Sequence, residues 1–339
     1  MLENPTDWYV IGGLLIGAIF GAIVRQQRMC LVAAFSYPRL SGDYRYAIGF
    51  VAAALVGISG TQLLEIYDIV DISSAPYRNA TLDWLGVLLG GLVFGIGATL
   101  AGGDAARIVV LAGQGSKSGW IALFFFAIFA SVAQFGLLAE LRVGSTHTTA
   151  IELVDSDAGI ASMLSVSPWI VLAVVDVILL GLIIKWKKHL DIKILLAGIV
   201  LGSTVIAAWY TTGVLAMDEF DPKSPSAITV SGPMSRTGTM IVSGEYPALS
   251  FAMSFVIGLL AISFVLAVLT RKFSFSPVTG SAGQIAFGGS LMGIGGTFAY
   301  GCSVGQGFSG LSTLSLESVI AVLSMVAGIN IATRWLEKR

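Results

Sequence analysis

The sequence predicts an all-α integral membrane protein with about nine transmembrane helices, short re-entrant helices and an inverted internal repeat. Three observations carry this prediction. Of the 339 residues, 55% are hydrophobic and only 12% are charged, whereas soluble domains carry about 25% charged residues. Uncharged segments recur along the chain at the length of a membrane span. A glycine-rich segment that starts at Gly90 recurs from Gly288.

The predicted spans are stretches of mostly apolar residues that approach the ~20 residues needed to cross a bilayer. They cover roughly 8–24, 46–64, 84–103, 118–139, 168–186, 194–210, 248–270, 283–300 and 315–335. The uncharged stretch from Phe273 to Leu316 is about twice the length of one span, so it must turn back. We expect the turn, and a re-entrant segment, at the glycine-rich residues Gly301–Gly307.

The positions of lysine and arginine predict the orientation, because basic loops stay on the cytoplasmic side of a membrane. With nine spans, four basic clusters fall on one side: Arg25 to Arg45, Lys185 to Lys193, Arg271 with Lys272, and Arg334 to Arg339. The N-terminus is therefore expected outside and the C-terminus in the cytoplasm. The acidic loops 142–167 and 218–247 then both face outward.

The internal repeat aligns Gly90–Asp104 with Gly288–Cys302, and most of the identical pairs are glycines. The first copy enters the membrane from outside and the second from inside, so the repeat is inverted. We expect one transmembrane domain built of two inverted halves, approximately 8–141 and 168–335. This architecture is typical of transporters and channels, which bind substrate at the repeat interface.

Composition excludes several other classes of protein. The formal net charge of −1 provides no basic field for nucleic acid. Two cysteines and two separated histidines predict neither a disulfide framework nor a metal site, and we expect no cofactor. No nucleotide-binding Gly-x-x-x-x-Gly-Lys-Ser/Thr motif is present, so ATP hydrolysis is not encoded. The chain is expected to be a transporter and not an enzyme.

Three polar segments, two of them rich in glycine, follow predicted spans and resemble one another. The first contains Cys30, the second Asp104 and Arg107, and the third Cys302 and Gln306. A helix that begins near the membrane midplane directs free N–H groups and its positive dipole end toward the centre, which favours an anion. A thiol adds a weak, polarizable donor, so these turns suit a sulfur-containing oxyanion.

The motifs at these turns resemble those of the YeeE/YedE family over essentially the whole chain. They are Gln27-Arg28-Met29-Cys30, the segment Gly95-Ile96-Gly97 that continues to Gly103, and Tyr300-Gly301-Cys302-Ser303. The resemblance implies a bacterial inner-membrane protein for thiosulfate uptake, with nine spans, short re-entrant helices and a narrow path lined by cysteines. It also implies that Cys30 and Cys302 line that path and that a small cytoplasmic sulfur-carrier protein is a partner.

The sequence departs from the family at Asp104, where the family motif has a third cysteine. A carboxylate beside a dianion is unfavourable, because unit charges ~4 Å apart interact by ~4 kcal/mol at an effective dielectric near 20. Three explanations remain open: Asp104 is protonated, it pairs with Arg107 one helical turn on, or the substrate differs.

The resulting hypothesis is an inner-membrane permease for thiosulfate or a related small sulfur-containing anion. Its substrate path is expected to involve Cys30, Asp104, Cys302, Arg107, Gln306, Gly103 and Gly301. For Arg107 and Gln306, structural roles within the broken helices are equally open. One alternative function is transport of another sulfur or selenium compound with Asp104 carrying a proton. Another is a membrane sulfur-relay protein in which a cysteine takes up sulfur covalently.

Overall fold

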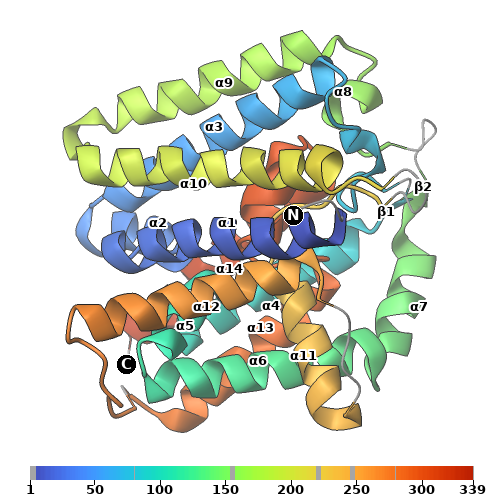
Figure 1. Ribbon diagram of the computed structural model, residues 1–339. Coiled ribbons are helices and arrows are strands. Elements are labelled where there is room, and N and C mark those ends of the chain that lie inside the picture. Colours follow the sequence, from blue (N-terminus) through green and yellow to red (C-terminus); the bar gives the residue numbers. More distant parts are fainter. Residues whose placement is uncertain are drawn as a thin grey trace.

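The computed structural model describes residues 5–79, 81–152, 157–218, 223–244, 249–278 and 280–338. They form an all-α bundle whose long helices run roughly alongside one another (Figure 1). The long helices are α1 (Pro5–Gln27), α3 (Arg45–Ile66), α4 (Trp84–Ala101), α6 (Lys117–Phe135), α9 (Pro168–Lys185), α10 (Ile192–Tyr210), α12 (Phe251–Leu269), α13 (Ala282–Phe298) and α14 (Leu316–Glu337). The prediction of an all-α membrane protein is therefore confirmed.

Shorter elements interrupt or connect these helices. They are α2 (Leu31–Ser41), η1 (Ile72–Ser74), α5 (Ala105–Gly113), α7 (Ala139–Thr149), α8 (Ile160–Met163), η2 (Lys187–His189), η3 (Thr211–Leu215), α11 (Ser231–Ser243) and η4 (Gly305–Gly310). Strands β1 (Thr81–Leu82) and β2 (Ile151–Glu152) form one antiparallel pair. In these short elements the chain turns between spans or breaks within one.

Eight helical segments of the described residues are long and apolar enough to cross a membrane. They correspond to eight of the nine predicted spans. The ninth, α13, has 17 residues, which lies at the lower end of the length that spans a bilayer. The centre of α13 is nevertheless deeply embedded, because it packs between α4 and α6.

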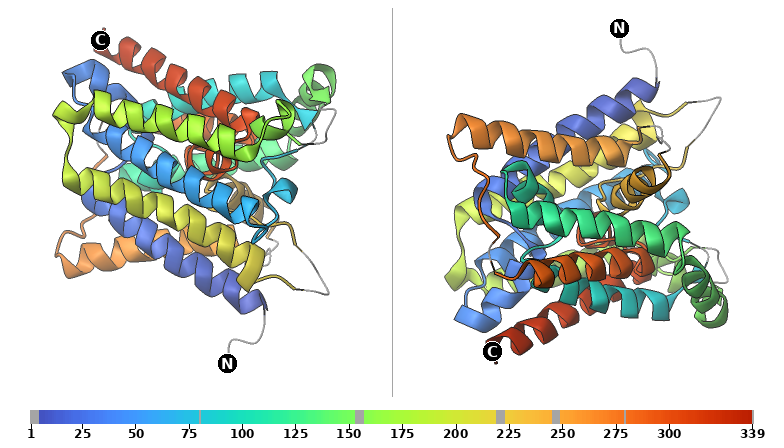
Figure 2. Two further views of the ribbon diagram at one scale, coloured as in Figure 1. Left: turned by 90° about the horizontal axis from the view of Figure 1, so that it is seen from above. Right: turned by 90° about the horizontal axis from the view of Figure 1, so that it is seen from below.

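The described residues of the four predicted basic clusters lie at one end of the bundle. Arg39, near the end of α2, binds Glu337 at the end of α14 with 3.3 Å between Nε and Oε2. Arg25 donates to the Thr270 hydroxyl after α12 at 2.9 Å. Tyr44 stacks on Trp186 beyond the end of α9 with 5.1 Å between ring centroids. We call this end, where α14 ends, the C-terminal face, and the opposite end, where α1 begins, the N-terminal face (Figure 2).

Helices α4 and α13, which carry the internal repeat, cross at the centre through glycines. A Cβ added at Gly90 would lie 2.8 Å from the Gly295 carbonyl oxygen, and one at Gly97 would lie 2.7 Å from that of Gly288. The two helices therefore run antiparallel, with backbones in direct contact. The helices around them also pack in matching pairs. The contact of α1 with α12 corresponds to that of α10 with α3, and the contact of α4 with α14 corresponds to that of α13 with α6.

The prediction of irregular backbone at Gly301–Gly307 is wrong for its last residues, which are helical from Gly305 onward. The chain breaks after α13 but then forms a π-helix, η4, in which the Ser309 amide donates to the Val304 carbonyl five residues earlier at 3.3 Å. Glycines at three of its six positions leave room for the wider turn. The segment after α10 is also a π-helix, η3, which continues that helix directly from Thr211.

Connections on the N-terminal face are held together by Arg78, which is only 8% exposed. Its guanidinium forms ion pairs with Glu65 at the end of α3 and with Asp157 before α8. The Arg78 Nε donates to Asp157 Oδ1 at 2.6 Å. One arginine therefore joins three segments of this face.

Candidate functional site

The first half of the predicted site forms where α1 ends and α2 begins, next to the point where α4 ends and α5 begins. We call these two adjoining interruptions together the first break. Cys30 is the N-cap of α2, and Asp104 is the N-cap of α5. The Asp104 amide donates to the Cys30 sulfur at 3.3 Å, and the Leu31 amide donates to Asp104 Oδ2 at 2.7 Å. The structure thus brings two residues that are far apart in the sequence into direct contact.

The Asp104 carboxylate also caps its own helix. Its Oδ1 accepts from the Arg107 amide at 3.0 Å, and the side chain is buried, with an exposed fraction of 5%. Each carboxylate oxygen is therefore bound by the N-terminal turn of a different helix. A negative charge is favoured at this place, because free amides and the positive dipole ends of α2 and α5 converge on it.

Of the three explanations left open for Asp104, pairing with the Arg107 side chain is not what the structure shows. Within the described residues, no ion pair of 4.0 Å or less joins the two side chains; Arg107 contacts the carboxylate through its backbone amide. The Arg107 Nη1 is buried and without a hydrogen-bond partner. A guanidinium donor beside this cluster is thus left for another acceptor.

The second half of the site lies at the interruption between α13 and η4, which we call the second break. Cys302 is fully buried, and its carbonyl accepts from the Gln306 amide at 2.8 Å. The Gln306 side chain donates through Nε2 to the Ala299 carbonyl at 2.7 Å and accepts from the Ser318 hydroxyl at 2.6 Å. Both ends of its amide are therefore engaged by the protein itself, as expected for a residue that caps a broken helix.

Gly103 and Gly301 occupy equivalent places in the two breaks. A Cβ at Gly103 would lie 2.7 Å from Arg107 Cγ, and one at Gly301 would lie 2.8 Å from Gln306 Cγ. The spacing is four residues in the first case and five in the second. These glycines are thus needed for packing at the breaks.

Tyr77 and Thr229 also reach the second break, and sequence reasoning missed both. A Cβ at Gly305 would lie 2.8 Å from Thr229 Oγ1 and 3.2 Å from the Tyr77 hydroxyl. Burial, reinforced by neighbouring Cys302, raises the pKa of Tyr77, so its phenol remains a proton donor. Both residues lie in connections between spans, where no sequence signal placed them near Cys302.

Between the two breaks the structure is nearly closed. A small cavity of about 20 Å³ lies beside Cys30 and Asp104, and apolar side chains make up most of its remaining wall, among them Phe20, Phe50, Val304 and Phe308. This volume holds about one water molecule. Cys302 does not line this cavity but lies two residues before Val304, which does.

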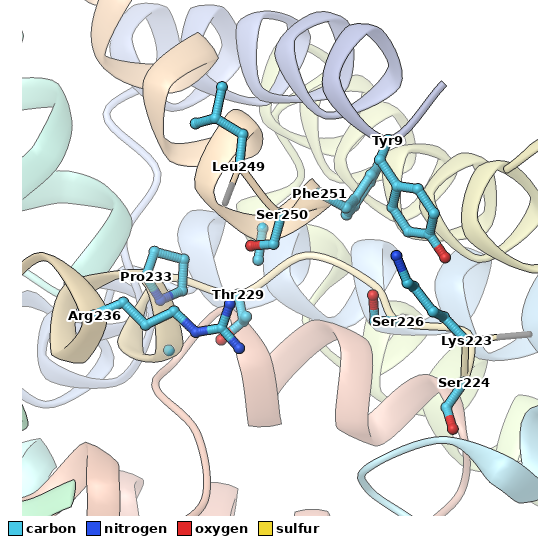
Figure 3. A pocket seen from close by; sticks show the side chains of 12 residues that line it. Tyr9, Lys223, Ser224, Ser226, Thr229, Pro233, Arg236, Leu249, Ser250 and Phe251 are labelled. Atoms are coloured by element: carbon cyan, nitrogen blue, oxygen red, sulfur yellow. The ribbon is translucent and has the colours of Figure 1, made fainter. Parts of the chain in front are cut away.

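Two larger cavities open on the N-terminal face above the second break, with volumes of about 510 and 470 Å³. Both are lined by Ser226, Thr229 and Arg236, and Tyr77 lines the second. Figure 3 shows Arg236 of α11 and Lys223 of the preceding loop on opposite sides of the first cavity. We call the two cavities together the vestibule. It combines cationic groups with several hydroxyls.

Comparisons with known proteins identify the family of this chain. A family model described as sulphur transport matches residues 26–331. The thiosulfate transporter TsuA of Escherichia coli (strain K12) is 25% identical over 356 aligned residues, which cover 96% of this chain and 94% of that protein. The thiosulfate transporter TsuA of Spirochaeta thermophila is 25% identical over 347 residues, which cover 96% and 98%. The chain thus belongs to the sulphur transport family and is a membrane transporter, not an enzyme.

Proposed function

We propose that the protein is a permease that takes up thiosulfate or a closely related small sulfur-containing anion. Two relatives that match nearly the full chain carry the name thiosulfate transporter. The single observation that carries the proposal is the placement of the two thiols. Cys30 and Cys302 lie at two helix breaks: Cys30 lines a small, mostly apolar cavity, and the buried Cys302 lies two residues before Val304 of the same wall.

The vestibule is the proposed entrance. Lys223 and Arg236 provide positive charge around a cavity large enough for a hydrated anion, and such a cavity raises the local concentration of anions. Hydroxyls of Ser226, Thr229 and Ser250 line the same space and supply donors to oxyanion oxygens. At the floor of the vestibule, Thr229 leads to Tyr77 and to the second break.

The two breaks provide the proposed narrow part of the path. At the second break the anion meets the Tyr77 phenol and the Cys302 thiol, and at the first break it meets Cys30 and the free Arg107 donor. Each thiol contributes one weak hydrogen bond, which permits binding without trapping, as conduction requires. Gly103, Gly301 and Gln306 support the path by shaping the breaks that hold these groups.

We further propose that the chain consists of two inverted halves, 8–141 and 168–335. The antiparallel glycine crossing of α4 and α13 and the paired packing of the surrounding helices support this symmetry. The first break lies toward the C-terminal face and the second toward the N-terminal face, as an inverted pair requires. A path between them can then open toward either side by movement of one half against the other.

The proposed location is the bacterial inner membrane, with the C-terminal face in the cytoplasm. The basic clusters gathered on that face support this orientation. The vestibule then opens to the outside, and the anion emerges beside Cys30. A cytoplasmic sulfur-carrier protein is the proposed recipient. Fusion of an alkaline phosphatase to the C-terminus should give an inactive enzyme, whereas an active one contradicts this orientation.

Uptake of radiolabelled thiosulfate into proteoliposomes tests the proposed function. Wild-type protein is expected to transport, and Cys302→Ala is expected to lose most of the uptake. Ser263→Ala is a suitable control, since Ser263 is also fully buried and lies in α12. Equal uptake by wild type and Cys302→Ala rejects the role of this thiol. Competition by unlabelled sulfite, sulfate or selenite separates thiosulfate from the other candidate substrates.

A further inference from the structure

The Asp104 carboxylate occupies the position where the starts of α2 and α5 would hold an anion. The amide of Leu31, the first residue of α2, donates to one carboxylate oxygen at 2.7 Å, and the Arg107 amide in the first turn of α5 donates to the other at 3.0 Å. Amides at helix starts attract anions. Here a side chain of the protein itself already fills the site.

This arrangement exceeds what a helix cap requires. Asp83, the N-cap of α4, accepts from the Gly86 amide of its own helix at 3.0 Å and from the Thr149 hydroxyl at 3.4 Å, and neither donor belongs to the start of a second helix. Asp104 makes the equivalent bond to Arg107 but also accepts from Leu31, 73 positions away, and returns a hydrogen bond from its own amide to the Cys30 sulfur. Two hydrogen bonds in opposite directions therefore join the start of α2 to the start of α5.

These bonds lie beside the smallest cavity on the proposed path. Asp104 and Cys30 line the cavity of about 20 Å³, which has room for about one water molecule. Phe50 and Phe308 are packed against each other on its wall, with ring centroids 5.2 Å apart. An anion with several heavy atoms does not fit this cavity, so its passage requires the surrounding elements to move apart.

We propose that the Asp104 carboxylate is a displaceable gate, which holds the first break closed until the transported anion competes with it for the Leu31 and Arg107 amides. This inference rests on the anion path proposed above. The anion substitutes for the carboxylate, so the amides keep an acceptor throughout. The free Arg107 Nη1 beside the cluster offers the arriving anion one further donor. A neutral side chain at position 104 should therefore weaken the closed state and remove the competing charge.

Accessibility of Cys30 tests the gate without any transport measurement. In a Cys302→Ser background, Cys30 is the only remaining thiol, because the sequence has two cysteines. We expect Asp104→Asn to raise the rate at which a small anionic methanethiosulfonate reagent modifies Cys30 by about tenfold, equivalent to about 1.4 kcal/mol. Asp83→Asn, a substitution at the other buried aspartate cap, should leave the rate unchanged. Equal rates in all three proteins overturn the proposal.

Uptake by proteins that keep Cys302 provides the second measurement. Asp104→Asn and Asp104→Cys are expected to lower the KM for thiosulfate, because the competing carboxylate is gone. If Asp104→Asn instead abolishes uptake while its melting temperature stays that of wild type, the carboxylate has another task and the gate is refuted. Absence of thiosulfate uptake by the wild type would refute the proposed function, whereas the Cys30 modification rates would still decide whether Asp104 closes the break.

Discussion

The Gln306 side chain donates to the Ala299 carbonyl at 2.7 Å and so joins η4 to the C-cap of α13. The Ser318 hydroxyl of α14 donates to the other end of the same amide at 2.6 Å. The second break is thus fixed by a side chain to both helices that flank it. The geometry of the second break therefore depends on the buried side-chain amide of Gln306.

Gln306→Ala should lower stability more than it lowers affinity for the substrate. The substitution leaves a buried carbonyl and a buried hydroxyl without their partner, which costs about 1–3 kcal/mol in all. The measurement is the melting temperature in detergent. Gln284→Ala is the control, because Gln284 is exposed at the start of α13. A raised KM with an unchanged melting temperature would instead identify Gln306 as a substrate ligand.

Gly95→Ala should destabilise the protein, whereas Gly181→Ala should not. A Cβ at Gly95 would overlap the Met325 carbonyl oxygen of α14, while one at Gly181 in α9 would meet no atom within 4 Å. We expect a loss of about 1–3 kcal/mol at Gly95 from overpacking. Gly181→Ala should be neutral or stabilise by up to about 1 kcal/mol, because alanine favours a helix. Equal melting temperatures for the two variants would contradict the close packing of α4 on α14.

Hydropathy and glycine spacing predicted most of the fold, because the bilayer imposes both the length of a span and the small residues at helix crossings. Eight of the nine predicted spans are helices that meet the length and hydropathy expected of a span, and Gly90 and Gly97 lie at a helix crossing. The π-helix at Gly305–Gly310 escaped prediction, since glycine runs were interpreted only as breaks. Its wider turn depends on the Gln306 bonds, which only the folded chain forms.

The candidate site was predicted in part. The sequence indicated Cys30 and Asp104 as polar groups at equivalent turns, and the structure places them in contact. Contacts formed by connections between spans could not be predicted, because such connections carry no periodic pattern. Tyr77 and Thr229 reach the second break in this way. The sequence left pairing of Asp104 with the Arg107 side chain as one of three explanations, whereas the structure uses the amides of Arg107 and of Leu31 on another helix.

Asp157→Asn should destabilise the N-terminal face at neutral pH but not in acid. Burial raises the pKa of Asp157, but hydrogen bonds from Arg78 and the Gly159 amide outweigh it and lower the pKa below the unfolded value of 3.8. The carboxylate therefore stabilises the fold above pH 3.8, and this contribution is lost as the pH falls through the folded pKa. The difference in melting temperature between wild type and variant should shrink below about pH 4. Asp71→Asn, at an exposed aspartate, is the control.

Arg236→Gln should raise the KM for thiosulfate and weaken the salt dependence of uptake. Arg236 is exposed and lines both cavities of the vestibule, and attraction between exposed charges is screened within about 8 Å at physiological ionic strength. At low salt the wild type should therefore have a lower KM than the variant, and the two values should converge as salt increases. Arg334→Gln, near the end of α14 on the C-terminal face, should leave the KM for uptake from the opposite side unchanged. Equal salt dependence in all three proteins would show that Arg236 does not attract the anion, and the entrance would then have to lie elsewhere on the N-terminal face.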